Sequence, residues 1–277
     1  MKSLPLFPPY VSLTERIWFF LLRGFNVLVL VFLVLPILVI IPLSFADSSF
    51  LSYPMPGLSL RWYDNLIHSE EWIRAAKNSF IVAPLATVIA TVLGTLAAVG
   101  LNKADFAGKG LLMAVLISPM VVPVVVVGVG VYLFFAQIGL ADTYTGLILA
   151  HAALGAPFVV TTVSATLQGF NHNLVRASLS LGAGPLRTFF RITLPVIAPG
   201  LISGALFAFA TSFDEVVITL FVAGPQQTTL PRQMFTGIKE NISPTIAALA
   251  TILIVFSTCL LLVLEWLRGR SKAAAKI

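Results

Sequence analysis

Residues Asn173–Leu201 read NLVRASLSLGAGPLRTFFRITLPVIAPGL. They contain most of the longest polar segment that lies between apolar runs on the side of the chain rich in Lys and Arg. Which side of a membrane this segment occupies depends on the apolar runs around it, and its role depends on that side.

The composition of the chain is that of a membrane protein. Apolar residues make up 58% of the sequence, charged residues make up 10%, and the mean hydropathy is +0.99. A soluble domain carries roughly 25% charged residues. The few charges here cluster between long apolar runs, which are continuous rather than alternating and so favour helices over a β-barrel. The sequence therefore predicts an all-α, polytopic membrane protein with a single transmembrane domain over residues 1–277.

Six apolar runs are each about 20 residues or longer, enough for a helix to cross roughly 30 Å of hydrocarbon. We predict membrane-spanning helices over residues 25–45, 79–101, 111–135, 144–167, 196–222 and 246–266. The fourth and fifth helices flank a polar loop at residues 168–195.

The Lys and Arg residues orient these six helices, because they are more frequent in cytoplasmic loops. With both termini in the cytoplasm, twelve of the 17 Lys and Arg residues fall on the inner side and five in outer loops. This excess predicts an N-in, C-in topology and places the loop at 168–195 in the cytoplasm. It also explains the net charge of +6, since the basic residues stand at helix ends and form no patch for nucleic acid.

The first half of the cytoplasmic loop predicts a short helix, Leu174–Leu181. Asn171 or Asn173 can cap its start, and Gly182 is suited to the left-handed residue that ends it. Four residues of this helix follow helical spacing and share one face: Leu174, Ala177, Ser178 and Leu181.

The second half predicts another short helix, Pro185–Ile192, since proline is suited to a first turn. Leu194–Pro195 is expected to end it and to open the fifth membrane helix. The residues alone leave two interpretations open. The loop can rest on lipid head groups through Arg187 and Arg191, or it can be a docking surface for a partner.

The loop resembles the cytoplasmic loop of ABC-importer permeases, whose pattern is Glu-Ala-Ala, three residues, Gly, nine residues, Ile, one residue, Leu-Pro. Five residues match this pattern at the correct spacing: Ala177, Gly182, Ile192, Leu194 and Pro195. Arg176 departs from it by reversing the charge of the usual Glu, and Ser178 replaces the second Ala.

The resemblance extends over nearly the whole chain and favours the spermidine/putrescine-type permeases. The stretches that carry it are GLSLRWYDNL at 57–66, LISPMVVPVVVVGVGV at 116–131, LILAHAALGAPFVVTTV at 147–163, SFDEVVITLFVAG at 212–224 and TLPRQMFTGIKENISPTIAALATILI at 229–254. Permeases for ferric iron, thiamine, sulfate and phosphonates share much of this framework, so other solutes stay open.

What the resemblance implies is a permease subunit of a type I importer in the bacterial inner membrane, moving a small, cationic solute inward. Its partners would be a dimer of ATPase subunits, a second permease of different sequence, an extracytoplasmic solute-binding protein and membrane lipid. The resemblance implies that the first short helix is the coupling helix, which sits in a groove of the ATPase. The coupling residues it implies across the loop are Leu174, Arg176, Ala177, Ser178, Leu181, Gly182, Ala183, Ile192, Leu194 and Pro195.

The sequence contains no G-x-x-x-x-G-K-[ST] phosphate loop. ATP and Mg²⁺ are therefore expected to act on the partner ATPase. The chain itself is expected to be a transport subunit rather than an enzyme, and to bind no cofactor.

Two carboxylates stand inside the fifth apolar run, where ionisable residues are functional candidates. Asp214 is predicted to share a helix face with Phe207 and Thr211, so that a carboxylate and an aromatic ring could both contact an ammonium group. For Asp214 the alternative is a hydrated carboxylate, or one paired with Arg232 or Lys239. That alternative is the favoured one for Glu215.

His151 is expected to be a hydrogen-bonded histidine of the interior. No metal site is predicted, because no second His or Cys stands at ligand spacing. Pro119 and Pro123 are expected to bend the third helix. Two rival functions remain: a polytopic membrane enzyme using Asp214, Glu215 and His151, and a proton- or sodium-driven carrier.

Overall fold

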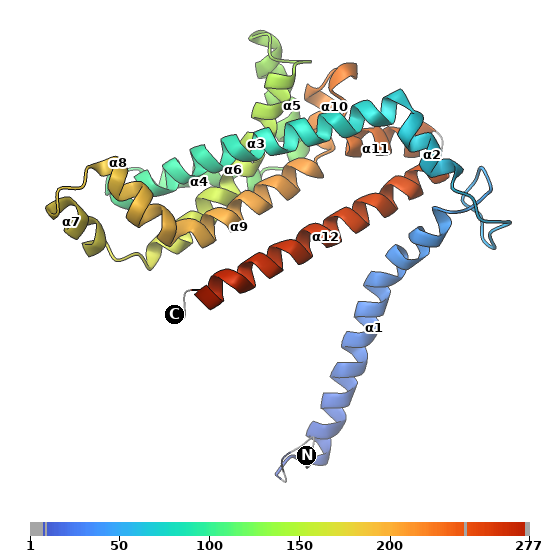
Figure 1. Cartoon of the computed structure of the whole chain (residues 1–277), viewed down its shortest axis with the longest axis horizontal. Helices are drawn as coiled ribbons and strands as arrows, with labels where there is room; N and C mark the ends of the chain where they lie inside the picture. Colours follow the sequence, from blue (N-terminus) through green and yellow to red (C-terminus); the bar gives the residue numbers. More distant parts are fainter. Residues whose placement is uncertain (1–7, 9, 241–242, 275–277) are drawn as a thin grey trace. The chain divides into compact units, whose positions relative to one another are not determined.

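The computed structural model describes residues 8, 10–240 and 243–274. Its elements in this part of the chain are helices, together with one isolated antiparallel bridge between Ala46 and Leu58. The all-α class predicted from the sequence is confirmed. The chain divides into two compact units, residues 1–67 with 240–277 and residues 68–239, which are coloured along the sequence in Figure 1.

The first unit holds two long helices, α1 (Leu13–Leu43) and α12 (Pro244–Ala274), which contact each other. The predicted span over residues 25–45 falls largely within α1, but the helix begins at Leu13. A capping box begins the helix earlier, because the Ser12 hydroxyl accepts from the Glu15 N–H and the Glu15 carboxylate accepts from the Ser12 N–H. Charged residues in the first turns interrupt the apolar pattern without ending the helix.

A short helix, α2 (Arg61–His68), follows the loop after α1. Two aromatic residues at its start bond back to the end of α1. Tyr63 Oη lies 2.7 Å from Ser44 Oγ, and Trp62 Nε1 donates to the Ala46 carbonyl at 2.8 Å. These bonds fix the direction in which the chain leaves α1.

The second unit is built on α3 (Glu70–Lys103), α6 (Tyr144–Gln168) and α9 (Leu194–Phe213), which pack on one another (Figure 1). The predicted helices 79–101 and 144–167 lie within α3 and α6. Small residues bring these helices close. A Cβ added at Gly94 would lie 2.8 Å from Val159 Cβ, and one added at Gly204 would lie 2.8 Å from Val159 Cα. We therefore place the core of this unit along one face of α6.

The predicted continuous third helix, 111–135, is wrong. The structure has α4 (Lys109–Val121) and α5 (Val124–Gln137), which meet at an angle of 107°. The break falls at Pro123, and Val122 before it is extended, a conformation that a residue preceding proline favours. Pro119, also expected to bend this helix, lies inside α4.

The predicted continuous fifth helix, 196–222, is also wrong. α9 ends at Phe213, residues 214–216 are not helical, and α10 covers Val217–Val222. A 3₁₀ turn (η2, Pro225–Gln227) and α11 (Leu230–Glu240) follow. α10 packs against α5 and α6, whereas α9 packs against α3 and α6, so the two pieces of the predicted helix share α6 and differ in their second neighbour.

In the described part of the chain, four helices are long and apolar enough to cross a membrane: α1, α3, α6 and the continuous helix Pro185–Phe213. α4 and α5 together make a fifth, as a broken span or a re-entrant loop. The described apolar part of α12 is shorter, Pro244–Cys259. The chain is thus a multi-pass membrane protein, and the sixth span and the orientation stay predictions.

Candidate functional site

The first helix of the loop between α6 and α9 is α7 (Asn173–Ser180). Its bounds lie one residue before the predicted Leu174–Leu181 at each end. The N-cap is His172, so neither predicted cap, Asn171 or Asn173, holds that position; Asn171 Oδ1, one residue earlier, accepts a hydrogen bond of 3.0 Å from the Asn173 N–H. Asn173 is itself the first helical residue.

Gly182 ends this helix as predicted. Its φ is +82°, the left-handed region that favours glycine. The Gly182 N–H donates to the Leu179 carbonyl and the Ala183 N–H donates to the Ser178 carbonyl, at 3.0 and 3.1 Å. These two bonds form a Schellman motif, so the turn after α7 depends on one backbone conformation at Gly182.

The second helix of the loop does not end where it was predicted to end. α8 (Pro185–Thr188) passes into a π-helical turn, η1 (Phe189–Thr193), and then directly into α9. The Leu194 N–H bonds to the Phe189 carbonyl, five residues back. Pro195 follows this wide turn and does not stop the helix, because proline is tolerated where an N–H has no helical partner.

One hydrogen bond joins the two short helices. Ser178 Oγ lies 3.0 Å from Thr188 Oγ1, and Thr188 is buried. Ser178, one of the two departures from the family pattern, therefore faces its own loop. The pair ties α7 to the helix that continues into the membrane core.

The outer surface of this loop is apolar and basic. Leu181 is 88% exposed and Leu186 is 75% exposed, while Arg176, Arg187 and Arg191 are exposed as well. Contiguous exposed apolar side chains mark surfaces that a protein or a membrane covers. We call the exposed residues of 173–191, which the sequence predicts to face a partner, the coupling surface.

The predicted coupling residues divide by exposure. Those that are exposed are Leu174, Arg176, Ala177, Leu181, Gly182 and Pro195, and those that are half-buried are Ser178, Ala183, Ile192 and Leu194. α7 and α8 lie together at one end of the long helices of the second unit (Figure 1). A partner at this end could reach α7 without entering the bundle.

The predicted solute-path residues lie at the far end of α9. Phe207 is 54% exposed and stacks on Phe158 with ring centroids 5.9 Å apart. Thr211 is half-buried one turn further on, and Asp214 is exposed where α9 ends. Among the described residues, the Asp214 carboxylate has no hydrogen-bond or ion-pair partner. The predicted alternative partners are engaged elsewhere: Arg232 donates to the Ala223 and Gly224 carbonyls, and Lys239 lies over the Phe235 ring.

The Glu215 side chain forms a hydrogen bond to the backbone of α10. Its Oε1 accepts a hydrogen bond of 2.9 Å from the Ile218 N–H, which caps the first turn of α10. Its backbone carbonyl accepts from Thr219 Oγ1 at 3.2 Å. The Glu215 carboxylate is therefore hydrogen-bonded to α10, whereas the Asp214 carboxylate has no such partner among the described residues.

His151 is a buried, hydrogen-bonded residue, as expected. Its ring nitrogens lie 2.9 Å from Ser212 Oγ and 3.1 Å from Thr219 Oγ1. No cluster of three or more His, Cys, Asp or Glu side chains that could hold a metal occurs among the residues that the structure describes.

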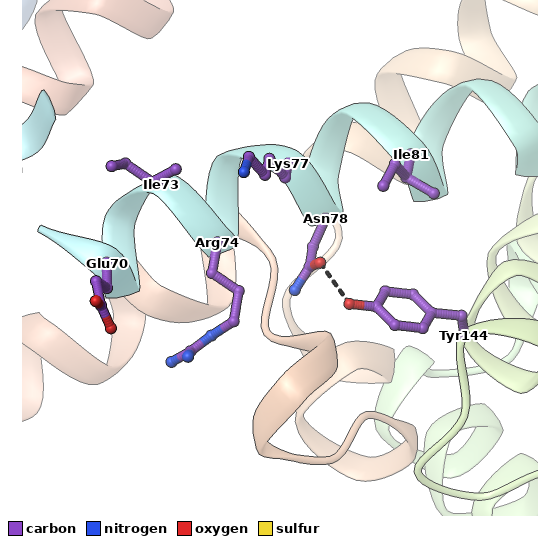
Figure 2. Close-up of a pocket in the computed structure, with 7 residues that line it drawn as sticks. All are labelled: Glu70, Ile73, Arg74, Lys77, Asn78, Ile81 and Tyr144. Carbon is purple, nitrogen blue, oxygen red and sulfur yellow. Dashed lines mark hydrogen bonds between the residues drawn. The ribbon is translucent and has the colours of Figure 1, made fainter.

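A pocket that the sequence did not indicate opens beside the start of α3. Its volume is about 370 Å³, and its lining residues are Glu70, Ile73, Arg74, Lys77, Asn78, Ile81 and Tyr144. Figure 2 shows the hydrogen bond between the Tyr144 hydroxyl and Asn78 Oδ1, which is 2.8 Å long. Asn78 Nδ2 also donates to the Gln226 and Thr228 carbonyls. Asn78 immediately precedes the predicted helix 79–101, and no local pattern in the sequence marked it.

Arg232 fixes the loop that follows α10. Burial lowers the pKa of its guanidinium from the ordinary value, and the nearby Asp142 carboxylate opposes this shift. Arg232 bonds the Ala223 and Gly224 carbonyls to α11, and Asn78 bonds the Gln226 and Thr228 carbonyls to α3.

These features define a class before any comparison is made: an all-helical, multi-pass membrane protein with an exposed two-helix segment at one end and an unpaired carboxylate in a broken helix. The family model for the binding-protein-dependent transport system inner membrane component matches residues 90–273. The chain belongs to this family.

Two relatives cover most of the chain. It is 33% identical over 242 residues to the spermidine/putrescine transport system permease protein PotC of Haemophilus influenzae, covering 87% of this chain and 94% of that one. It is 36% identical over 241 residues to the putrescine transport system permease protein PotI of Escherichia coli, covering 84% of each. Because these relatives are permeases, the chain is a transport subunit rather than an enzyme.

A solved structure has the same fold. It is a bacterial ABC transporter involved in the import of the acidic polysaccharide alginate, with a TM-score of 0.77 and 14% sequence identity, covering 93% of this chain and 99% of the matched chain. At this identity the likeness describes the fold alone.

Proposed function

We propose that this chain is a permease subunit of an ATP-driven importer for small, cationic solutes of the polyamine type. It lies in the bacterial inner membrane as six spans, N-in and C-in, and builds the solute path with a second permease of different sequence. A solute-binding protein delivers the solute from outside. The observation that carries this proposal is the identity, over most of the chain, to permeases named for spermidine and putrescine.

Energy enters through the coupling surface. The helix α7 docks into a groove of an ATPase subunit, which binds ATP and Mg²⁺ and hydrolyses ATP. The exposed Leu181 and Leu186 supply apolar contacts, and the loop's arginines face the ATPase surface. Movement of α7 passes through the Ser178–Thr188 bond into the helix that runs unbroken to Phe213. ATP binding must favour one arrangement of the bundle over the other for this coupling to work.

The solute path includes the exposed end of α9. Among the described residues, no cation pairs with the Asp214 carboxylate, and Phe207 stands two helical turns earlier with 54% of its surface exposed. An ammonium group is attracted by both. Glu215 takes no part in solute binding, because its carboxylate caps α10. Ferric iron, phosphonate, thiamine and other amines are the alternative solutes.

The test is uptake by the whole complex. This chain, its second permease and the ATPase are reconstituted in proteoliposomes, with the binding protein outside and ATP inside, and radiolabelled spermidine is followed. We expect accumulation that requires ATP, the binding protein and the ATPase. Accumulation driven by a proton or sodium gradient in the absence of the ATPase would instead identify a secondary carrier.

A further inference from the structure

The break between α9 and α10 lies in the apolar part of the second unit. Residues 214–216 are not helical, so backbone groups on both sides lose regular helical partners. Such groups are costly in an apolar environment unless other groups satisfy them. The relative position of α9 and α10 therefore depends on the side chains that form hydrogen bonds to both helices.

His151 of α6 spans the break. The side chain is buried, with 1% exposed. Nδ1 lies 2.9 Å from Ser212 Oγ and 3.1 Å from the Ser212 carbonyl, in the last turn of α9. Nε2 lies 3.1 Å from Thr219 Oγ1, in the first turn of α10. One imidazole ring thus joins the two helices that flank the break.

The imidazole joins the two helices in either neutral tautomer. With the proton on Nδ1, this nitrogen donates to the Ser212 carbonyl at 3.1 Å, and Nε2 accepts from the Thr219 hydroxyl. With the proton on Nε2, Nδ1 accepts from the Ser212 hydroxyl at 2.9 Å, Nε2–H donates to Thr219 Oγ1, and the Thr219 hydroxyl can donate to the Glu215 carbonyl, 3.2 Å away. Either arrangement links the end of α9 to the start of α10 through α6.

His151 lies on the part of α6 that packs against both α9 and α10. A Cβ added at Gly155 would lie 3.0 Å from Ala208 Cβ of α9. Leu154 lies in one apolar cluster with Ile218 of α10. α6 therefore supports both helices, and His151 supplies the polar link between them.

We propose that His151 is a positioning residue that fastens α9 to α10 across the break and thereby fixes the Asp214 carboxylate in the solute path. The second part of this inference rests on the proposed function. The fastening itself does not.

The link between α9 and α10 is tested by measuring the distance between spin labels on the two helices. In the full reconstituted complex with Cys259 replaced by Ser, spin labels are placed at the exposed positions Ala210 and Leu220, and their distance distribution is measured. Thr219→Val removes the hydroxyl that bonds His151 but keeps the side-chain volume, and Thr219→Ser restores it. We expect a broader distribution in Thr219→Val and a native one in Thr219→Ser.

A matched control is Thr161→Val on α6. The Thr161 hydroxyl bonds only to carbonyls of its own helix, at 3.0 Å from Pro157 and Phe158. This variant is expected to leave the distance distribution unchanged. An unchanged distribution in Thr219→Val would overturn the fastening.

Positioning is tested by the amount of spermidine transported per ATP hydrolysed. One hydrogen bond is expected to change a conformational equilibrium by about 2- to 10-fold, so Thr219→Val should lower this ratio by that factor while ATP hydrolysis stimulated by the loaded binding protein persists. A parallel loss of yield, ATP hydrolysis and uptake would show a merely structural role and overturn the positioning. If the wild-type complex takes up no spermidine, the proposed function fails, while the distance measurement still decides the fastening.

Discussion

We expect the proposed coupling surface to be most sensitive to substitution at Gly182. Its φ of +82° is a conformation that costs a residue with a Cβ roughly 1–2 kcal/mol, and more for a β-branched side chain. An equilibrium shift of about 5- to 30-fold away from the native turn follows from this cost. Gly182→Val should therefore displace α7, because the two bonds of the Schellman motif form only in the native turn.

The assay is ATP hydrolysis by the reconstituted complex with and without the loaded binding protein, together with spermidine uptake. We expect Gly182→Val to assemble in the membrane and to lose most of the stimulated hydrolysis and of the uptake. Gly182→Asn adds comparable bulk, but asparagine tolerates the left-handed region, so this variant should retain most of both activities.

The control lies two residues away. Gly184 has an ordinary φ of −68°, and nothing lies within 4 Å of a Cβ added there. Gly184 is itself exposed in the coupling surface, but Gly184→Val keeps the backbone of the turn and should therefore lose much less stimulated hydrolysis and uptake than Gly182→Val. Equal losses in Gly182→Val, Gly182→Asn and Gly184→Val would refute the reasoning from backbone conformation and point to bulk alone.

Three further predictions follow from the second unit. Gly204→Val forces a side chain against Val159 and should destabilise the protein by about 1–3 kcal/mol, seen as a lower Tm in detergent. Gly130→Val should leave Tm close to that of the wild type, because nothing lies within 4 Å of a Cβ added there. Asp214→Asn should lower spermidine uptake by about 10-fold, the effect of losing one charge-assisted contact, while stimulated ATP hydrolysis persists; unchanged uptake would remove Asp214 from the path. Asn78→Leu should speed hydrogen exchange at residues 225–230, because two loop carbonyls lose their donor.

The sequence predicted elements wherever local patterns decide them. The helices over 79–101 and 144–167 and the left-handed Gly182 follow from apolar length and from glycine chemistry, and the structure confirms them. Pro119 and Pro123 carry the same local signal, yet the chain breaks only at Pro123. Which proline breaks a helix depends on the packing of the pieces, here α5 on α10, and that information is absent from the local sequence.

The candidate site was also predictable only where a local sequence pattern determines it. The spacing from Ala177 to Pro195 identified the loop and its two helices, but not the π-helical turn that joins the second helix to α9. Asp214 was identified by its charge within an apolar run. The bonds of Asn78 to residues about 150 positions later in the chain, and the link from His151 across the α9–α10 break, arise from tertiary contacts that no local pattern encodes.

The central claim is that α7 receives the ATPase, and a cross-link tests it most directly. In a Cys259→Ser background, Ala177→Cys places a single thiol on the exposed side of α7, and Thr145→Cys places one at an exposed position of α6. Each thiol is labelled with a benzophenone photocrosslinker in the assembled complex. We predict a cross-link to the ATPase subunit from residue 177 and none from residue 145. Absence of that cross-link from residue 177 in a complex that still contains the ATPase would contradict the account.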